Sequence, residues 1–281
     1  MSIASTIEKT WRDSLDNAVG ESLWSVVVFA PRADVAAVVR DEAVYSAGAL
    51  IHGFIAEIVE RAVAGGALAW TDMVNIAPAH AAGTSGVLSA GMVPVRLPLH
   101  TAVNIMLTTS DDAAAAALVD LLGGVATVND TLARAGYDRS RIRMLAGVGD
   151  PRADEWQPDP HLPSHQAAAV TCARDVFGNL RAIAASPVLG PMLAAHTHRA
   201  GLARNARPTE RMRHLTAAVA GARHDVAVTD LSDQPGDVCY TLVLTDGLDR
   251  ADSLDDATWQ AMADSHAHTQ LDLAGAAAPE G

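Results

Sequence analysis

Residues 83–124 have the sequence GTSGVLSAGMVPVRLPLHTAVNIMLTTSDDAAAAALVDLLGG, and the order of features in this stretch decides the fold. A glycine-bounded turn comes first, and an apolar helix is predicted to follow it. Ser110, Asp111 and Asp112 lie within the apolar segment 100–122, which is followed by the pair Gly123 and Gly124. Glycine just beyond a periodic apolar segment is a typical helix stop. The stretch therefore predicts a glycine-punctuated segment followed by helix over residues 100–122.

Outside this stretch, strand-like and helix-like segments are distributed unevenly. Short β-branched runs typical of buried strands lie near both ends of the chain, at 24–30, 35–40, 211–218, 222–230 and 237–246. Helical spacing is found at 3–15, 50–62, 100–122, 125–136, 171–185 and 187–198, and around Trp259. Residues 144–170 carry four prolines and are expected to form a long surface loop.

This distribution predicts an α+β fold with a discontinuous sheet domain. We expect an antiparallel sheet flanked by helices and built from residues 1–45 and 200–275, with an all-helical domain, 46–199, inserted between them. Residues 276–281 are expected to be a disordered tail, because chain ends without apolar anchors fray.

The composition excludes some partners. The 281 residues carry a net charge of −13 with scattered arginines, so we expect no nucleic-acid partner, which would need a basic face. No apolar run approaches the roughly 20 residues that span a bilayer, and the N-terminal residues lack an apolar signal segment, so we expect no membrane association and a cytoplasmic location. Cys172 and Cys239 are expected to be buried thiols.

The ordered features of 83–124 resemble the class A β-lactamase family of serine hydrolases. That family carries a glycine-bounded turn, a helix, and a Ser-Asp-Asn motif at the start of a second apolar helix that ends in Gly-Gly. Here the motif is Ser110-Asp111-Asp112. The predicted elements follow the family's order from the first helix to the last, so the resemblance implies a β-lactamase-like fold over nearly the whole chain.

The family's other two motifs are degenerate in this chain. Its Ser-x-x-Lys motif, laid on residues 45–51, places the nucleophile position at Gly48 and the lysine position at Ile51. Its Lys-Thr-Gly motif falls on Leu215-Thr216-Ala217, followed by a hairpin to a strand with Asp225. The chain contains one lysine, Lys9, so neither motif lysine is present in any register. Because a serine hydroxyl needs a neighbouring base to attack, we predict no acyl-enzyme chemistry.

The resemblance also implies which binding groups are kept. In the family, the substrate carboxylate is held by groups that correspond to Ser110, Thr216 and Arg223, and charge-assisted hydrogen bonds suit such a ligand. The family's oxyanion hole uses backbone N–H groups, which correspond to those of Gly48 and Ala218. Ser110 and Asp112 are candidate catalytic residues, with Asp112 as an acid or base. We expect no metal and no cofactor.

Simpler roles are open for several of these residues. Ile51 shares a helix face with other apolar residues and fits a core position, while Gly48 fits a helix start where serine would also be tolerated. Asp111 is expected to be a buried, hydrogen-bonded carboxylate, and Asp112 equally fits a helix cap. Arg223 fits a surface ion pair. The orientations of His52 and His214 and the role of Glu155 are open.

Three functions follow as hypotheses. The first is a catalytically retired β-lactamase-like protein that binds a small carboxylate-bearing molecule. The alternative is a non-covalent isomerase, cyclase or hydrolase, in a role such as specialised metabolism, which reuses the cleft with acid and base residues. The third is a protein-interaction module whose cleft is unused. The sequence leaves the ligand and the oligomeric state open.

Overall fold

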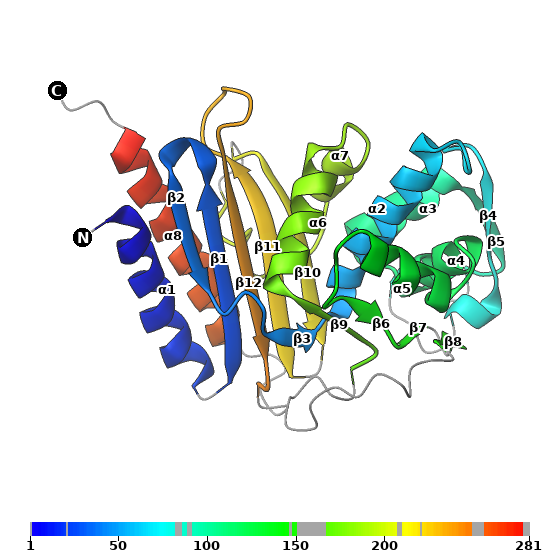
Figure 1. Cartoon of the computed structure of the whole chain (residues 1–281), viewed down its shortest axis with the longest axis horizontal. Coiled ribbons are helices and arrows are strands. Elements are labelled where there is room, and N and C mark those ends of the chain that lie inside the picture. The colour runs from blue at the N-terminus through cyan, green and yellow to red at the C-terminus, as the bar shows by residue number, and fades with distance from the viewer. Residues whose placement is uncertain are drawn as a thin grey trace.

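The computed structural model describes residues 2–20, 22–81, 86–88, 92–145, 148–150, 167–206, 210–219, 221–248 and 256–277. Within these residues the largest sheet has five strands in the order β10-β11-β12-β1-β2, and every neighbouring pair is antiparallel. Its strands are β1 (Leu23–Ala30), β2 (Val35–Val39), β10 (Met212–Val219), β11 (Ala222–Asp230) and β12 (Val238–Asp246). The predicted antiparallel sheet from both chain ends, with its α+β fold class, is confirmed (Figure 1).

Helices cover both faces of this sheet. The helices α1 (Ile3–Val19) and α8 (Asp256–Ala277) lie together on one face, and α6 (Ala173–Ala185) lies on the other (Figure 1). Trp11 of α1 donates from Nε1 to Thr269 Oγ1 of α8 at 3.0 Å, which ties the two outer helices together. Because both faces are covered, β11 is buried along nearly its whole length and shows no polar–apolar alternation.

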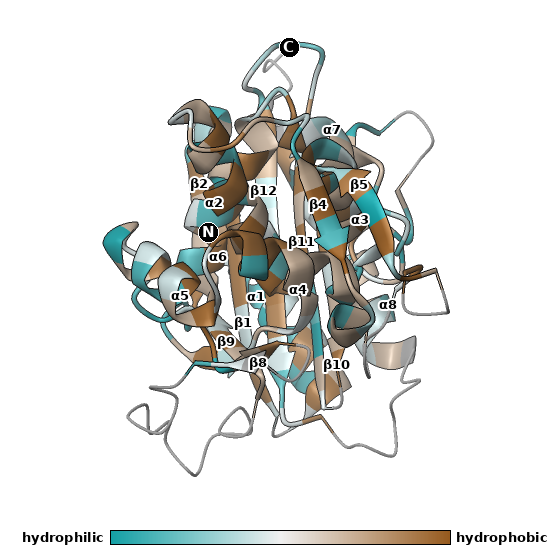
Figure 2. Cartoon of the chain, turned by 90° about the vertical axis from the view of Figure 1, so that its right-hand side faces the viewer, coloured by the Kyte–Doolittle hydropathy of each residue, from teal (hydrophilic) through white to brown (hydrophobic). Residues whose placement is uncertain are grey.

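The middle of the chain forms a second helical layer beyond α6. It contains α2 (Ile51–Ala64), α3 (Leu99–Thr109), α4 (Asp112–Leu121), α5 (Val125–Arg134) and the short α7 (Leu189–Ala194). Its core joins apolar side chains of these helices to the inner face of the sheet in one cluster. Figure 2 shows hydrophobic residues along the strands of the sheet and a mixture of hydrophobic and hydrophilic residues on outer helices such as α5.

This middle part also contains short strands that the periodicity did not predict. One three-stranded sheet joins β3 (Val44–Ser46), β9 (Ala169–Cys172) and β6 (Arg141–Ile142). Two-stranded pairs are formed by β4 (Met73–Ile76) with β5 (Val95–Pro98), and by β7 (Met144–Leu145) with β8 (Val148–Gly149). Strands of two to four residues contain too few alternations to be distinguished from loop in the sequence. They are held by pairing across the chain.

Two sequence expectations are refined by the structure. The helical segment 100–122 is broken at Ser110, whose φ of 53° lies in the left-handed region and ends α3 before α4 begins. The expected loop at 144–170 has strands in its described ends, while Glu155 lies outside the described residues. Cys172 and Cys239 are buried free thiols, as expected. The division into domains at residues 45 and 200 stays a prediction.

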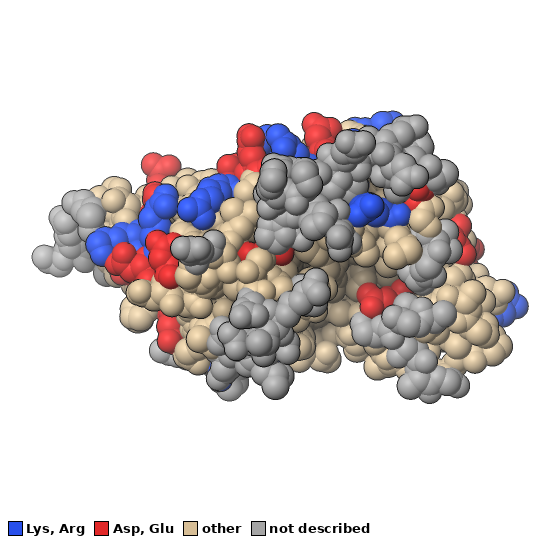
Figure 3. Space-filling view, turned by 90° about the horizontal axis from the view of Figure 1, so that it is seen from below, with Lys and Arg blue, Asp and Glu red and all other residues tan. Residues whose placement is uncertain are grey.

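None of the described helices is by itself long and apolar enough to cross a bilayer. Helices α4 and α5, which are bent by 81° relative to each other, meet the length and composition criterion only as a pair. Every α4 residue from Ala113 to Val119 is buried in the protein core. On the face shown in Figure 3, acidic and basic side chains of the described residues are intermixed.

Candidate functional site

The start of α2 meets the edge of the sheet. Gly48 opens the 3-10 turn η2 (Gly48–Leu50), and a Cβ atom added to it would lie 3.1 Å from Val219 Cγ1 and 3.2 Å from Ala217 Cβ. The φ of Gly48 is +49°, a left-handed conformation that L side chains disfavour. The expectation that serine would fit at Gly48 therefore conflicts with the structure, because both the backbone angle and the close approach of β10 favour glycine.

Strand β10 lies at the edge of the sheet and presents backbone donors to this region. The Thr216 N–H points away from β11 and donates to His196 Nε2 at 3.3 Å. Successive residues of a strand alternate in the direction of their N–H groups, so the Ala218 N–H faces the same open edge. Ala218 is also exposed. The Ala218 N–H therefore lies at the outer edge of β10, and its role as a ligand donor stays a prediction.

The polar corner at Ser110 is fixed by its central aspartate. Asp111 is fully buried and caps α4, accepting from Ala114 N and Leu88 N at 2.8 Å each. Gly86 packs so closely on the Asp111 carboxylate that no Cβ fits there. The expected structural role of Asp111 follows from this geometry. The cap is Asp111, and Asp112 is the first residue inside the helix rather than its cap.

Ser110 and His52 bring unpaired polar atoms to this corner. Ser110 Oγ is buried and has no hydrogen-bond partner, and both ring nitrogens of His52 are buried without one. His52 Nε2 lies 3.3 Å from Asp112 Oδ1, close enough for an electrostatic contact but outside hydrogen-bond geometry. The Asp112 side chain is 33 % exposed, so it connects the buried imidazole to the surface. An imidazole and a carboxyl group at this spacing can share one proton when a ligand or water aligns them.

His52, and not Ile51, is thus the α2 residue that faces the Ser110–Asp112 corner. Ile51 is 2 % exposed and belongs to the apolar core, as its simpler interpretation held. If His52 takes the lysine position of the Ser-x-x-Lys motif, the serine position falls three residues earlier, on Ala49. Helical geometry explains the difference, because each residue along α2 turns the side chain by about 100° and a shift of one residue moves it to another face.

Two more histidines, His196 and His214, lie in this region. No motif in the sequence pointed to His196. The rings of His196 and His214 are 5.0 Å apart, edge to face, and both are buried. His196 Nδ1 faces the Leu107 carbonyl at 2.7 Å, while its Nε2 accepts from Thr216 N, which fixes a neutral tautomer. Burial lowers the pKa of His196 to about 4 and that of His214 to about 3. Both are neutral at pH 7.

The expected carboxylate cradle is only partly assembled. Thr216 and Arg223 lie diagonally on paired strands, but the Thr216 hydroxyl is within 3.1 Å of Asp225 Oδ1 and 3.2 Å of the His198 carbonyl oxygen. Arg223 is buried, and its Nη1 donates to the carbonyls of Val219 and Ala222 at 2.8 Å each. Neither group meets Ser110. Thr216 and Arg223 therefore hold the β10–β11 hairpin, a role that spacing in the sequence could not distinguish from ligand binding.

Asp225 is a buried anchor of the same hairpin. Its Oδ2 accepts from Leu202 N at 2.7 Å, and burial raises the pKa of its carboxyl to about 7. His214 Nδ1 lies 4.0 Å from Asp225 Oδ1. Across the ranges that the structure describes, no three His, Cys, Asp or Glu residues converge as metal ligands. The region brings together imidazoles, the hydroxyls of Ser110 and Thr216, and carboxylates.

Comparison with known proteins places this geometry in a family. The family model described as the beta-lactamase enzyme family matches residues 7–265. The chain belongs to the beta-lactamase enzyme family. A comparison with curated proteins gave no match. The family model covers both the sheet and the helical layer, so the Gly48–Leu50 turn, the Ser110–Asp112 corner and β10 all lie within the matched residues.

Solved structures support the same fold. A beta-lactamase from Sphaerobacter thermophilus superposes with a TM-score of 0.76 at 22 % identity, over 98 % of this chain and 99 % of that one. A representative class A beta-lactamase from Bacteroides cellulosilyticus superposes with a TM-score of 0.77 at 14 % identity, over 98 % of this chain and 99 % of that one. A protein named PBP-A superposes with a TM-score of 0.72 at 16 % identity, over 95 % of each chain. These similarities establish the fold.

Within this family frame the chain lacks the expected base. Its single lysine, Lys9, lies in α1 and pairs with Asp13 at the surface, far along the chain from the Ser110–Asp112 corner. Ser46, the serine before Gly48, lies in β3 and uses its backbone N–H to bind Asp246 Oδ2 at 2.8 Å. The groups left at the corner are hydrogen-bond donors and one acid–base pair, not a nucleophile with a lysine.

Proposed function

We propose that this β-lactamase-family protein binds a small carboxylate-bearing molecule at the α2–β10 cleft without forming an acyl-enzyme. In this proposal Ala49 and His52 occupy the two ends of the Ser-x-x-Lys spacing, in place of the earlier assignment to Gly48 and Ile51. Ala49 has no nucleophilic atom, and the His52 imidazole replaces the lysine ammonium of the family motif. The observation that carries the proposal is the presence of unpaired, buried polar atoms on Ser110 and His52.

Unpaired polar atoms in a protein interior are costly, at about 1–3 kcal/mol each, and usually have a partner that is a ligand or an ordered water. The donors that we propose for the ligand are the Ser110 hydroxyl, one N–H of the His52 ring in either tautomer, and the Ala218 N–H on the edge of β10. A carboxylate only accepts hydrogen bonds, so its chemistry complements this set. Arg223 serves in this scheme as a hairpin anchor that holds the strand edge in place.

A non-covalent enzyme is the second candidate, and the 3.3 Å contact of His52 Nε2 with Asp112 Oδ1 favours it. Asp112 begins α4, where the positive end of the helix dipole favours the ionised carboxylate. An ionised Asp112 would orient His52 and stabilise its protonated form during a proton transfer. His52 would then act as the acid or base, with Ser110 and the Ala218 N–H polarising a carbonyl group of the substrate.

Three measurements test the first proposal. Incubation with a reporter penicillin should leave the intact mass unchanged, and turnover of a chromogenic cephalosporin should equal a protein-free blank. Acetate and succinate should raise the melting temperature more than acetamide does, since only binding to the folded state shifts the unfolding equilibrium. Ser110→Ala should reduce that shift, by an affinity loss of about 1.5–3 kcal/mol expected for a hydrogen bond to a charged group.

Ser22→Ala is the matched control, because Ser22 is a partly exposed serine just before β1 whose hydroxyl already donates to the Gly247 carbonyl. A stoichiometric penicillin adduct on any serine would refute the non-acylating proposal. Equal stabilisation by acetate and acetamide, or no effect of Ser110→Ala, would refute carboxylate recognition at this corner. Loss of a measured turnover in His52→Gln, with binding retained, would instead establish the second candidate.

A further inference from the structure

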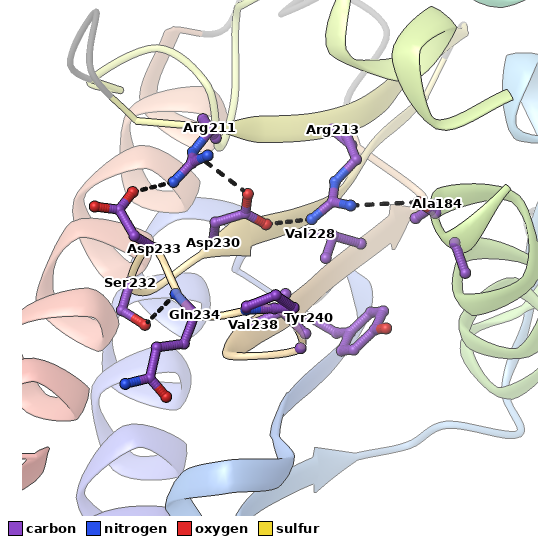
Figure 4. A pocket seen from close by; sticks show the side chains of 13 residues that line it. Ala184, Arg211, Arg213, Val228, Asp230, Ser232, Asp233, Gln234, Val238 and Tyr240 are labelled. Carbon is purple, nitrogen blue, oxygen red and sulfur yellow. Dashed lines mark hydrogen bonds and ion pairs between the residues drawn. The ribbon is translucent and has the colours of Figure 1, made fainter. Parts of the chain in front are cut away.

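A second concave site lies at the opposite end of β10 from the cleft. A cavity of about 410 Å³ is bounded by the ends of β10, β11 and β12, the end of α6 and the turn between β11 and β12. Its polar wall contains Arg211, Arg213 and Asp230, and its apolar wall contains Val238 and Tyr240 (Figure 4). Ala218 is seven residues further along β10 than Arg211, or about 23 Å at 3.3 Å per residue. The two sites are therefore separate.

The polar wall contains two arginines and two aspartates, of which Asp230 is 25 % exposed and Asp233 is fully exposed. Figure 4 shows the Asp230 carboxylate between two guanidinium groups. Asp230 Oδ1 accepts from Arg213, and Asp230 Oδ2 lies 3.7 Å from Arg211 Nε. One carboxylate is thus shared by two arginines. Arg211 has a second partner, Asp233, but the Asp233 side chain is fully exposed on the turn. Exposed ion pairs contribute little, so a ligand anion can replace Asp233 at small cost.

Arg213 is more firmly held and gives the wall a fixed position. Its Nη1 donates to the Ala184 carbonyl at the end of α6 at 3.3 Å, and its side chain is 26 % exposed. The turn that closes the cavity is also fixed, because Gln234 N donates to Ser232 Oγ at 3.2 Å and Arg32 donates to Gln234 Oε1 at 2.7 Å. The Arg211 side chain is 62 % exposed and can therefore change its conformation to contact a ligand.

The apolar wall is an aromatic ring that is held in place by other rings. Tyr240 lies edge to face with Phe177 at 5.5 Å and 6.3 Å from Phe29, and Phe29 and Phe177 are themselves 5.5 Å apart. The chain has three phenylalanines and three tyrosines, and half of these six rings gather here, each only partly buried. A preorganised ring loses little entropy when it contacts a ligand.

We propose that this cavity, whose lining residues we term the Arg211 site, binds a small organic monoanion with an aromatic body. Its single negative charge would pair with the Arg211 guanidinium, whose fork geometry matches a carboxylate. Its ring would pack on Tyr240 and Val238. A dianion would be disfavoured because Asp230 lies between the two arginines. The Arg211 site stands independently of the cleft proposal, since the two share no residue.

The probe is phenylacetate, titrated into the full-length protein by calorimetry, with phenylacetamide as its neutral counterpart. We expect saturable binding of phenylacetate and none of phenylacetamide at the same concentrations. Arg211→Gln should weaken binding by about tenfold, the loss of one charged hydrogen bond. Tyr240→Ala should weaken it as well, whereas Tyr240→Phe should retain it. Arg211 is exposed, so its variant is expected to fold, and the melting temperature of each variant checks this.

Two controls assign the binding to this cavity. Arg181→Gln removes an arginine that lies over the Phe177 ring, 5.6 Å from its centroid, and outside the cavity lining, so it should leave the affinity unchanged. Ser110→Ala alters only the cleft and should also leave it unchanged. Absence of saturable binding, or equal weakening by Arg211→Gln and Arg181→Gln, would overturn the proposal. Weakening by Ser110→Ala alone would place phenylacetate in the cleft and overturn it equally.

Discussion

The two halves of helix α2 differ in whether their buried polar side chains are hydrogen-bonded. Near its middle, Glu57 is 4 % exposed, and its carboxylate accepts from Arg61, from Tyr137 Oη at 2.8 Å and from Asn179 Nδ2 at 2.7 Å. Near its start, His52 is fully buried, and neither ring nitrogen has a hydrogen bond. The first arrangement is complete within the protein. The second has buried polar atoms without a hydrogen bond, and in the proposed function these atoms contact the ligand.

The same contrast holds between histidines. His196 and His224 each use both ring nitrogens on main-chain groups, whereas those of His52 and His214 have no hydrogen bond. A residue of the same type therefore has different roles in neighbouring parts of one site. The predictions that follow test whether completed polar clusters supply stability while incomplete ones supply binding.

The largest effect is expected from Glu57→Ala. This change leaves Asn179 and the Tyr137 hydroxyl without their buried acceptor, so the free energy of unfolding should fall by about 3 kcal/mol. Urea denaturation measures the loss. The control is Glu8→Ala, which removes a surface carboxylate paired with Arg12 on α1 and should lower stability by less than about 1 kcal/mol. Equal effects of the two changes would remove the distinction drawn between the clusters.

Acid should destabilise the protein through the histidines with completed contacts. His224 Nε2 donates to the Ser46 carbonyl and its Nδ1 accepts from Thr245 N, so protonation would set two N–H groups against each other. Burial lowers the pKa of His224 to about 4, below the 6.5 of an unfolded chain. The stability it contributes is complete above pH 6.5 and is lost as the pH falls from 6.5 toward 4, by about 1.4 kcal/mol per pH unit at most.

Urea unfolding at pH values between 7.5 and 4.5 measures this dependence. The wild-type protein should lose stability across the window, and His224→Gln should lose less, because glutamine does not protonate there. His268→Gln is the control, since His268 is exposed on α8. Asp225, with its pKa raised to about 7, acts in the opposite direction, because its contribution is present at low pH and is lost as the pH rises toward 7. An unchanged slope in His224→Gln would contradict the assignment.

Gly48→Ser should destabilise the protein by about 1–2 kcal/mol, the expected penalty for a left-handed non-glycine residue. Gly66→Ser is a matched control, because Gly66 also has a positive φ, of +75°, but nothing lies within 4 Å of its added Cβ. A larger loss at Gly48 than at Gly66 would measure the contact with Val219 and Ala217. No loss at Gly48 would restore the sequence-based expectation that serine fits there.

The smallest effect, and one of opposite sign, is expected from His52→Leu. Replacing an unpaired buried imidazole by an apolar side chain removes an unsatisfied group, so the free energy of unfolding should stay the same or rise by about 1 kcal/mol. The stabilisation by acetate should disappear. Ile51→Val is the adjacent control in the apolar core and should lower stability by about 1 kcal/mol without affecting acetate. A stability loss in His52→Leu as large as in Glu57→Ala would show that both halves of α2 are structural.

Much of the fold could be predicted because it rests on local patterns. The run 24–30 is too apolar to be anything but a buried element, and Ile7, Trp11 and Leu15 recur at the spacing of one helix face. Residues 100–122 were expected to be helical throughout, although the Ser110–Asp112 motif was recognised. A single left-handed residue does not change the spacing of apolar residues, so the helix break at Ser110 could not be predicted from periodicity. The short strands β3, β6 and β9 pair residues that are 27 to 128 positions apart, which no local pattern records.

The candidate site was only partly predictable for a related reason. Ser110, Asp112 and Ala218 were selected, and their roles in binding or catalysis stay predictions, whereas Asp111 proved structural as expected. Thr216 and Arg223 were expected to bind a ligand, but their polar atoms contact Asp225 and hairpin carbonyls. His196 was not selected from the sequence as a site residue. Its contact with Thr216 N depends on the packing of the segment after α7 against β10.

The sequence by itself determined that both motif lysines are absent, because the chain has a single lysine, at position 9. The order of the predicted elements along the sequence also determined the family. Only the tertiary structure decided which residue of α2 faces the Ser110–Asp112 corner, because a shift of one position along a helix turns a side chain by about 100°. It also decided which polar atoms are left unpaired. Hydrogen bonds between distant segments form only when the chain is folded, and the sequence does not record their geometry.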